Sequence, residues 1–177
     1  MTRHPLFMNS ELSRFLKKEF HKKMVADLPE FQKAGTAFGG VIYRKHDAEN
    51  GCYLFIFLEP NPKSDRFTLE LAAATVPNFP FNLLPGEQEP PREVRYRITT
   101  FLEKKSDAWW NVNVSESPLP DFDAIMRTFE PEAIQNGLVK VPELVEDAFR
   151  QLQAVLPKFI STLPKEQVAK GWSPLSR

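Results

Sequence analysis

The strongest constraint on the fold is an apolar run at residues 52–59, CYLFIFLE, which follows the turn signal Glu49-Asn50-Gly51. The run is short and dense in β-branched and aromatic side chains, which favours a strand over a helix. Successive side chains of a strand point to opposite faces, so an almost unbroken apolar run predicts a strand that is covered on both faces. We therefore expect this segment to be the central strand of a sheet.

Other strand patterns lie on both sides of this run, and helical patterns lie near both chain ends. The further expected strands are residues 36–45, 66–75, 92–102 and 109–112. The expected helices run from Asn9 or Ser10 to just before Pro29, and over residues 141–163, with loose tails at 1–8 and 171–177. The links between strands are too short for helical crossovers, so neighbouring strands should be antiparallel.

This order of elements predicts the fold class. We expect one α+β domain over residues 1–177, with a single antiparallel sheet of four to five strands in meander order. The N-terminal and C-terminal helices should pack on one face of that sheet.

Glycine and proline positions refine these elements. Gly39-Gly40, inside the first strand pattern, predicts a bulge or a close approach of two backbones. Gly137 is expected to end a turn as a left-handed cap, and Pro142 to occupy the first turn of the C-terminal helix. Pro157 is expected to kink that helix, because its ring clashes with the carbonyl of the preceding turn.

Charge and cysteine content exclude several classes of protein. Lys plus Arg and Asp plus Glu are balanced at 23 each, which argues against general binding of nucleic acid or anionic lipid. No apolar run approaches the roughly 18 residues of a membrane span. Cys52 is the one cysteine, and with no secretory segment near Met1 we expect a cytoplasmic protein. Cys52 opens the most apolar stretch, which predicts an inert structural thiol.

The chain carries no recognised cofactor motif. The three histidines, His4, His21 and His46, are scattered, and neither HExxH nor paired CxxC is present. There is no GxGxxG or GxxxxGK[ST] phosphate loop, and no nucleophile elbow around a serine. We therefore expect no metal and no cofactor.

The most distinctive polar feature is a group of arginines that follows a proline-rich loop. Five prolines stiffen residues 76–91, which also carry Phe79 and Phe81. Arg92, Arg95 and Arg97 follow directly, and Arg95 and Arg97 should share one face of a strand. Aromatic and arginine side chains are enriched at binding hot spots, so this segment is a candidate surface for a partner.

Two structural alternatives compete with that interpretation. Phe79, Phe81 and Leu84 would fold back over an open sheet face, and the arginines would pair across strands with Glu70 or Glu93.

Trp110 completes the candidate surface. In a strand, one ring of the Trp109-Trp110 pair should point to the core and the other outward, where it would anchor a partner. Trp172 covering that ring is the structural alternative.

An enzyme is the alternative functional hypothesis. Asp65, Glu70 and the run Glu103-Lys104-Lys105 are the acidic and basic groups that a metal-dependent hydrolase or nuclease would use. The ordered Glu-x-Lys after a Pro-Asp, found in nucleases of the restriction type, is not present.

Loose motifs resemble one protein family. Phe20-His21-Lys22-Lys23, Tyr43-Arg44-Lys45 and the segment Asp65 to Leu71, DRFTLEL, are similar to the bacterial domain-of-unknown-function family of the 4304 type, over roughly residues 12–112. The resemblance implies no established activity and transfers no catalytic residue. Analogy with small α+β proteins near toxin or defence genes implies an immunity- or defence-associated role. We therefore expect a non-catalytic binding module for a protein partner.

Overall fold

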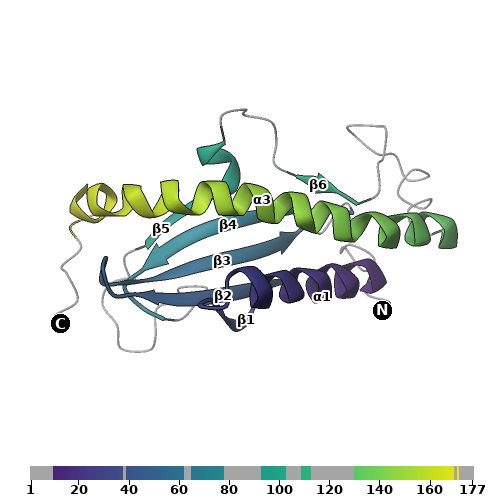
Figure 1. Cartoon of the computed structure of the whole chain (residues 1–177), viewed down its shortest axis with the longest axis horizontal. Helices are drawn as coiled ribbons and strands as arrows, with labels where there is room; N and C mark the ends of the chain where they lie inside the picture. Colours follow the sequence, from purple (N-terminus) through teal and green to yellow (C-terminus); the bar gives the residue numbers. More distant parts are fainter. Residues whose placement is uncertain are drawn as a thin grey trace, which may run out of the picture.

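The structure is a computed structural model that describes residues 10–37, 39–61, 65–77, 93–102, 109–112, 130–169 and 171. These residues form two long helices and one antiparallel sheet (Figure 1). In chain order the elements are α1 (Ser10–Asp27), β1 (Gln32–Ala37), β2 (Gly40–Asp47), β3 (Cys52–Pro60), β4 (Arg66–Ala74), β5 (Glu93–Arg97), the 3-10 helix η1 (Ile98–Phe101), β6 (Trp110–Asn111) and α3 (Pro131–Ala169). The predicted α+β class is confirmed.

The strands pair in sequential order from β1 to β5, and every pair is antiparallel, which confirms the meander. The short β6 also pairs with β4, at the end that β5 leaves uncovered. Strand β5 pairs with residues 70–74 of β4, and β6 pairs with Arg66 and Phe67. The two strands thus continue one line along the same edge of β4.

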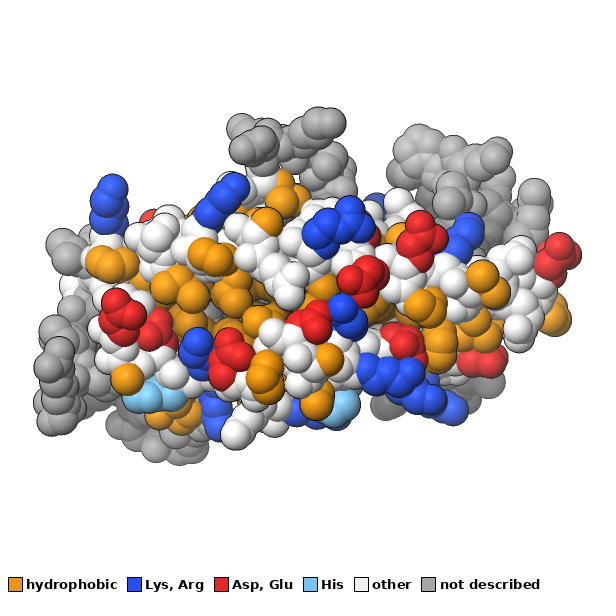
Figure 2. All heavy atoms as spheres, in the orientation of Figure 1, with side chains coloured by type: hydrophobic (Ala, Val, Ile, Leu, Met, Phe, Trp, Pro, Cys, Tyr) orange, Lys and Arg blue, Asp and Glu red, His pale blue; other side chains and the backbone are white. Residues whose placement is uncertain are grey.

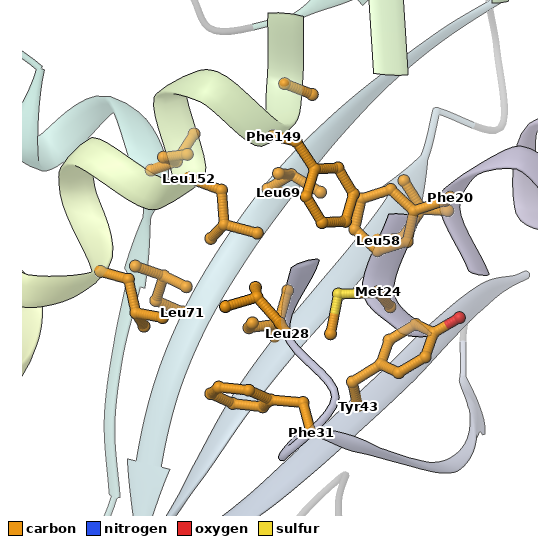
Figure 3. Close-up of a cluster of buried hydrophobic side chains, with 14 of the residues drawn as sticks. Phe20, Met24, Leu28, Phe31, Tyr43, Leu58, Leu69, Leu71, Phe149 and Leu152 are labelled. Atoms are coloured by element: carbon orange, nitrogen blue, oxygen red, sulfur yellow. The ribbon is translucent and has the colours of Figure 1, made fainter. Parts of the chain in front are cut away.

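Both helices cover one face of the sheet and run in the same direction across it (Figure 1). In α1 the apolar residues recur every four positions, so that Leu12, Leu16, Phe20 and Met24 are buried on one stripe. Figure 3 shows Phe20 and Met24 of α1 and Phe149 and Leu152 of α3 over side chains of the sheet. The Phe20 and Phe149 rings lie 4.9 Å apart between centroids and join the two helices.

The opposite face of the sheet, which we call the far face, has its own buried apolar centre. Its members are Ile42, Phe55, Phe57, Ala72 and Ala74. Strand β3 therefore buries side chains on both faces, as the apolar run at residues 52–59 predicts.

The first predicted strand is wrong in its extent. Residues 36–45 contain parts of two strands, β1 and β2, which meet in a tight turn at Gly39 with φ of 78°. This left-handed conformation favours glycine, because a Cβ would clash with the backbone there. The expected close approach of backbones is correct for Gly40. A Cβ on Gly40 would overlap the carbonyl oxygen of Leu58 and come within 2.6 Å of Phe57 Cε2.

The C-terminal helix is longer than predicted. It begins at Pro131 and continues through Pro142, Pro157 and Pro164, all of which are exposed. Water can hydrogen-bond to the carbonyls that these prolines leave unpaired, so a helix tolerates proline best on its solvent side. Gly137 is not the predicted left-handed cap, because it is buried within α3 and lacks a positive φ.

Several expectations fall on other parts of the chain. The predicted tail at 1–8, the loop residues 78–91 and Trp172 lie outside the described residues.

Cys52 is fully buried, and burial, with a smaller effect of the Asp47 charge, raises the pKa of its thiol to about 12. The thiol is therefore protonated at neutral pH, in agreement with a structural role. Neither α1 nor α3 combines the length and the apolar character needed to cross a bilayer.

Gly40 provides a test of the close packing between β2 and β3. We expect Gly40→Ala to lower the free energy of unfolding by about 2 kcal/mol or more, because the added methyl meets a main-chain carbonyl that cannot move independently. Gly35→Ala is the matched control, since no atom lies within 4 Å of a Cβ built there. Urea denaturation of the two variants checks this, and equal stabilities would contradict the packing.

Candidate functional site

The register of the sheet divides the far face into an apolar part and a polar part. On β4, side chains at every second position point to this face. Ala72 and Ala74 belong to the apolar part, and Arg66, Thr68 and Glu70, at the other end of the strand, belong to the polar part. Glu59 of β3 lies opposite Thr68, and Arg97 of β5 lies opposite Glu70. Because directly opposed residues share a face, the register brings these charged side chains together.

Glu70 is at the centre of this polar part and is only 8% exposed. Arg95 Nε donates a hydrogen bond of 2.6 Å to Glu70 Oε2, and Arg95 Nη2 forms an ion pair with the same oxygen. Arg97 Nε lies 3.6 Å from Glu70 Oε1, an ion pair too long for a hydrogen bond. Charge-assisted bonds of this kind offset the cost of burying a carboxylate.

Glu59 is the second carboxyl of the polar part. Burial raises its pKa above the ordinary value, and the Glu70 charge and a hydrogen bond with Glu70 raise it further. Arg97 and Arg95 oppose these effects only in part. Two carboxyls in contact cannot both ionise easily, so this pair favours keeping one proton. Glu59 Oε2 is shielded from solvent and has no hydrogen-bond partner within the described part of the chain.

Beside the carboxyl pair, Trp109 lies in contact with two arginines. The guanidinium carbon of Arg66 is 4.6 Å from the centroid of the indole, and that of Arg97 is 5.2 Å away. These distances are in the range of cation–π attraction. The register explains the contact: Arg66 and Phe67 face Asn111 and Trp110, so Trp109 continues the line of β5 next to Arg97. We call Arg66, Trp109 and Arg97 the arginine–tryptophan stack.

Within the described part of the chain, the two arginines of this stack have few other polar contacts. Arg66 forms no ion pair with any described residue, and its Nε is shielded from solvent without a hydrogen-bond partner there. Arg97 has a side chain that is 50% exposed, and Glu70 is its one ion-pair partner in the described ranges. The stack thus offers guanidinium N–H donors that form no hydrogen bond to a carboxylate of the described residues.

Two further arginines lie over aromatic rings of the far face. Arg95 is 5.9 Å from the ring centroid of Phe57, and Arg44 is 5.8 Å from that of Tyr53. Arg44 Nη1 also donates a hydrogen bond of 2.7 Å to the carbonyl of Pro77. In these pairs the aromatic ring fixes the plane of the guanidinium, so its donors point along a defined direction.

The predicted site residues have different positions in the structure. Arg95 and Arg97 share the far face, as predicted, and the alternative of cross-strand pairing with Glu70 is correct for both, at hydrogen-bond distance for Arg95 and as a longer ion pair for Arg97. Phe79, Phe81 and Arg92 lie outside the described residues.

The expectation that Trp110 is exposed does not hold, because it is only 6% exposed. Its ring stacks on Phe67 at 5.3 Å, and its Nε1 donates a hydrogen bond of 2.9 Å to Asp147 of α3. Period-two alternation then places Trp109 on the far face.

The carboxyl pair, Arg95 and the arginine–tryptophan stack together form one polar cluster on the far face. Three of its members were not predicted as site residues: Glu59, Arg66 and Trp109. A signal for Glu59 is present in the sequence, since it is the one charged residue of the apolar run at 52–59 and shares a face with Phe57. For Arg66 and Trp109 the signal depends on the pairing of β6 with β4, which no local pattern specifies.

Chemically, the cluster is suited to bind an anion. It places three arginines against two carboxyls, and burial and the Glu70 charge raise the pKa of one of them, Glu59. Asp65, the other carboxylate of the enzyme hypothesis, is buried at 6% exposure. Among the described residues, no three His, Cys, Asp or Glu side chains are grouped to hold a metal.

Comparisons with known proteins found no matching family model, no matching curated protein and no matching solved structure. The resemblance to the 4304-type family therefore remains a prediction from the sequence.

The carboxyl pair gives a prediction for the pH dependence of stability. A carboxyl whose pKa is raised in the folded state stabilises the fold below its ordinary value of 4.5, and this contribution is lost as the pH rises through the folded pKa. Glu59→Gln keeps a hydrogen-bond donor for Glu70 but cannot ionise. We expect the melting temperature of the variant, relative to the natural protein, to be higher at about pH 7.5 than at about pH 4.

Differential scanning fluorimetry at both pH values checks this. Glu49→Gln, in the exposed turn between β2 and β3, is the control and should show no such difference. An effect of Glu59→Gln that is equal at the two pH values would contradict the shared proton.

Proposed function

We propose that the chain is a non-catalytic cytoplasmic binding module that recognises an acidic segment of a protein partner with the polar part of its far face. The observation that carries the proposal is the arginine–tryptophan stack. Arg66 and Arg97 both lie on the indole of Trp109, and neither forms a hydrogen bond to a carboxylate of the described residues. Guanidinium groups held by an aromatic ring are prepared for bidentate binding of an anionic group.

The charge distribution favours a local recognition site over a general polyanion binder. The chain has no net charge, so it lacks the broad positive field that concentrates nucleic acid or anionic membrane. Figure 2 shows that charged side chains of both signs are interspersed on the helix side of the molecule. A concentrated group of arginines with one aromatic ring has the composition of a protein-interface hot spot.

The hydrolase or nuclease hypothesis is second. It is favoured by the Glu59–Glu70 pair, since a carboxyl with a raised pKa is suited to act as a general acid. It is weakened because Arg95 donates a hydrogen bond to Glu70 and forms an ion pair with it, which reduces the ability of that carboxylate to bind a metal or activate water. The arginine–tryptophan stack has no assigned role in that chemistry.

Arg97 provides the test of the binding proposal. We expect Arg97→Ala to weaken partner binding roughly tenfold or more, as expected for a hot-spot arginine. The melting temperature should change little, because Arg97 is half exposed and its ion pair with Glu70 is long. Partners are isolated on the immobilised natural protein, and affinities of each isolated partner for the variants are measured by calorimetry.

Arg14→Ala is the matched control, because Arg14 is an exposed arginine on α1, on the other side of the sheet. It should bind as the natural protein does. Equal affinity of a partner for Arg97→Ala, Arg14→Ala and the natural protein would contradict the proposal that this surface binds the partner.

A further inference from the structure

The two arginines of the stack create an electrostatic imbalance. Arg66 and Arg97 carry like charges beside a single ring, with their guanidinium carbons 4.6 Å and 5.2 Å from its centroid. Both guanidiniums lie against the same ring, so their like charges repel each other, and the effect is larger where protein excludes water. Within the described part of the chain, the ion pair of 3.6 Å between Arg97 and Glu70 is the one direct compensation.

The neighbouring carboxyls do not remove this imbalance. Glu70 is bound at close range by Arg95, which uses both Nε and Nη2 on one carboxylate oxygen. Burial and the Glu70 charge raise the pKa of Glu59, which disfavours a second negative charge beside Glu70. Within the described residues Arg95 is the close partner of Glu70, so only the longer Arg97–Glu70 ion pair offsets the positive charges of Arg66 and Arg97.

This charge and geometry select one class of anion. A carboxylate has one charge and two oxygens, which suits one guanidinium, as Glu70 does with Arg95. A phosphomonoester carries about −1.5 to −2 charges at neutral pH and three acceptor oxygens. It can therefore accept hydrogen bonds from two guanidiniums at once and match two positive charges.

We infer that the arginine–tryptophan stack is a binding site for a phosphomonoester group. The inference deepens the proposed function. It rests on that function in one respect, because it assigns the phosphate to a side chain of the protein partner. Arg66 and Arg97 bind the phosphate oxygens, and Trp109 holds both guanidiniums beside the ligand.

The test follows the Nε–H signals of Arg66 and Arg97 and the indole signal of Trp109 by NMR. The full chain is titrated with a short phosphoserine peptide, the same peptide with serine, the same peptide with glutamate, and inorganic phosphate. Trp109→Phe assigns the indole signal. We expect the phosphoserine peptide to shift all three signals and to bind roughly tenfold more tightly than the glutamate peptide, the gain expected from one added charge-assisted interaction.

A pair of variants links the shifts to the stack. Arg97→Gln should weaken phosphopeptide binding roughly tenfold, and Arg14→Gln, on the exposed side of α1, should leave it unchanged. Melting curves verify that both variants are folded. Phosphopeptide binding that is unaffected by Arg97→Gln would overturn the inference.

The peptide arms distinguish failure of this inference from failure of the proposed function. Equal affinity for the glutamate and phosphoserine peptides would overturn the phosphate site and support recognition of an acidic segment. A further outcome is that inorganic phosphate binds as tightly as the phosphopeptide and shifts the same signals. That result would support the phosphate site but contradict the proposal that the phosphate is carried by a side chain of a protein partner. No shift with any phosphate probe would overturn the inference.

Discussion

Glu70 is the residue on which the polar part of the far face depends. Its carboxylate is almost completely buried in β4, the strand that pairs with β3, β5 and β6. A buried carboxylate that loses its partner typically destabilises a fold by about 3–5 kcal/mol. The position of β5 is therefore constrained, because Arg95 must reach Glu70 from the register in which Ala72 faces Arg95 and Glu70 faces Arg97.

This constraint separates the roles of two arginines on one strand. Arg95 binds Glu70 at hydrogen-bond distance and lies over Phe57, so its guanidinium is used within the fold. Arg97 is the residue directly opposite Glu70, yet its Nε remains 3.6 Å from the carboxylate, and its guanidinium lies on Trp109 instead. The burial of Glu70 thus positions Arg95, which has a structural role, and Arg97, whose donors can bind a ligand.

Much of the fold follows from local sequence patterns. Alternation in β4 places Phe67, Leu69 and Leu71 toward the helices, and the four-residue spacing in α1 gives its buried stripe. The errors have local causes too. Gly39 was interpreted as part of one strand, although its positive φ makes a turn between two. Gly137 and Pro142 predict a helix that begins near residue 141, whereas the exposed positions of the prolines allow one continuous helix from Pro131.

The candidate site was less predictable, because it depends on contacts between distant segments. Alternation is enough to place Arg95 and Arg97 on one face, and a carboxylate partner was expected for them. The contact of Trp109 with Arg66 requires β6 to pair with β4 some forty residues earlier in the sequence, across segments with no fixed spacing. A two-residue strand carries too little pattern to specify such a partner.

The central claim is that the buried pair of Glu70 and Arg95 organises the far face, and a double-mutant cycle tests it most directly. The free energies of unfolding of Glu70→Gln, Arg95→Gln and the double variant are compared with that of the natural protein by urea denaturation. The expected coupling energy is about 1–3 kcal/mol, with the double variant more stable than the sum of the single effects implies. Additive effects, with a coupling within about 0.3 kcal/mol of zero, would contradict the claim.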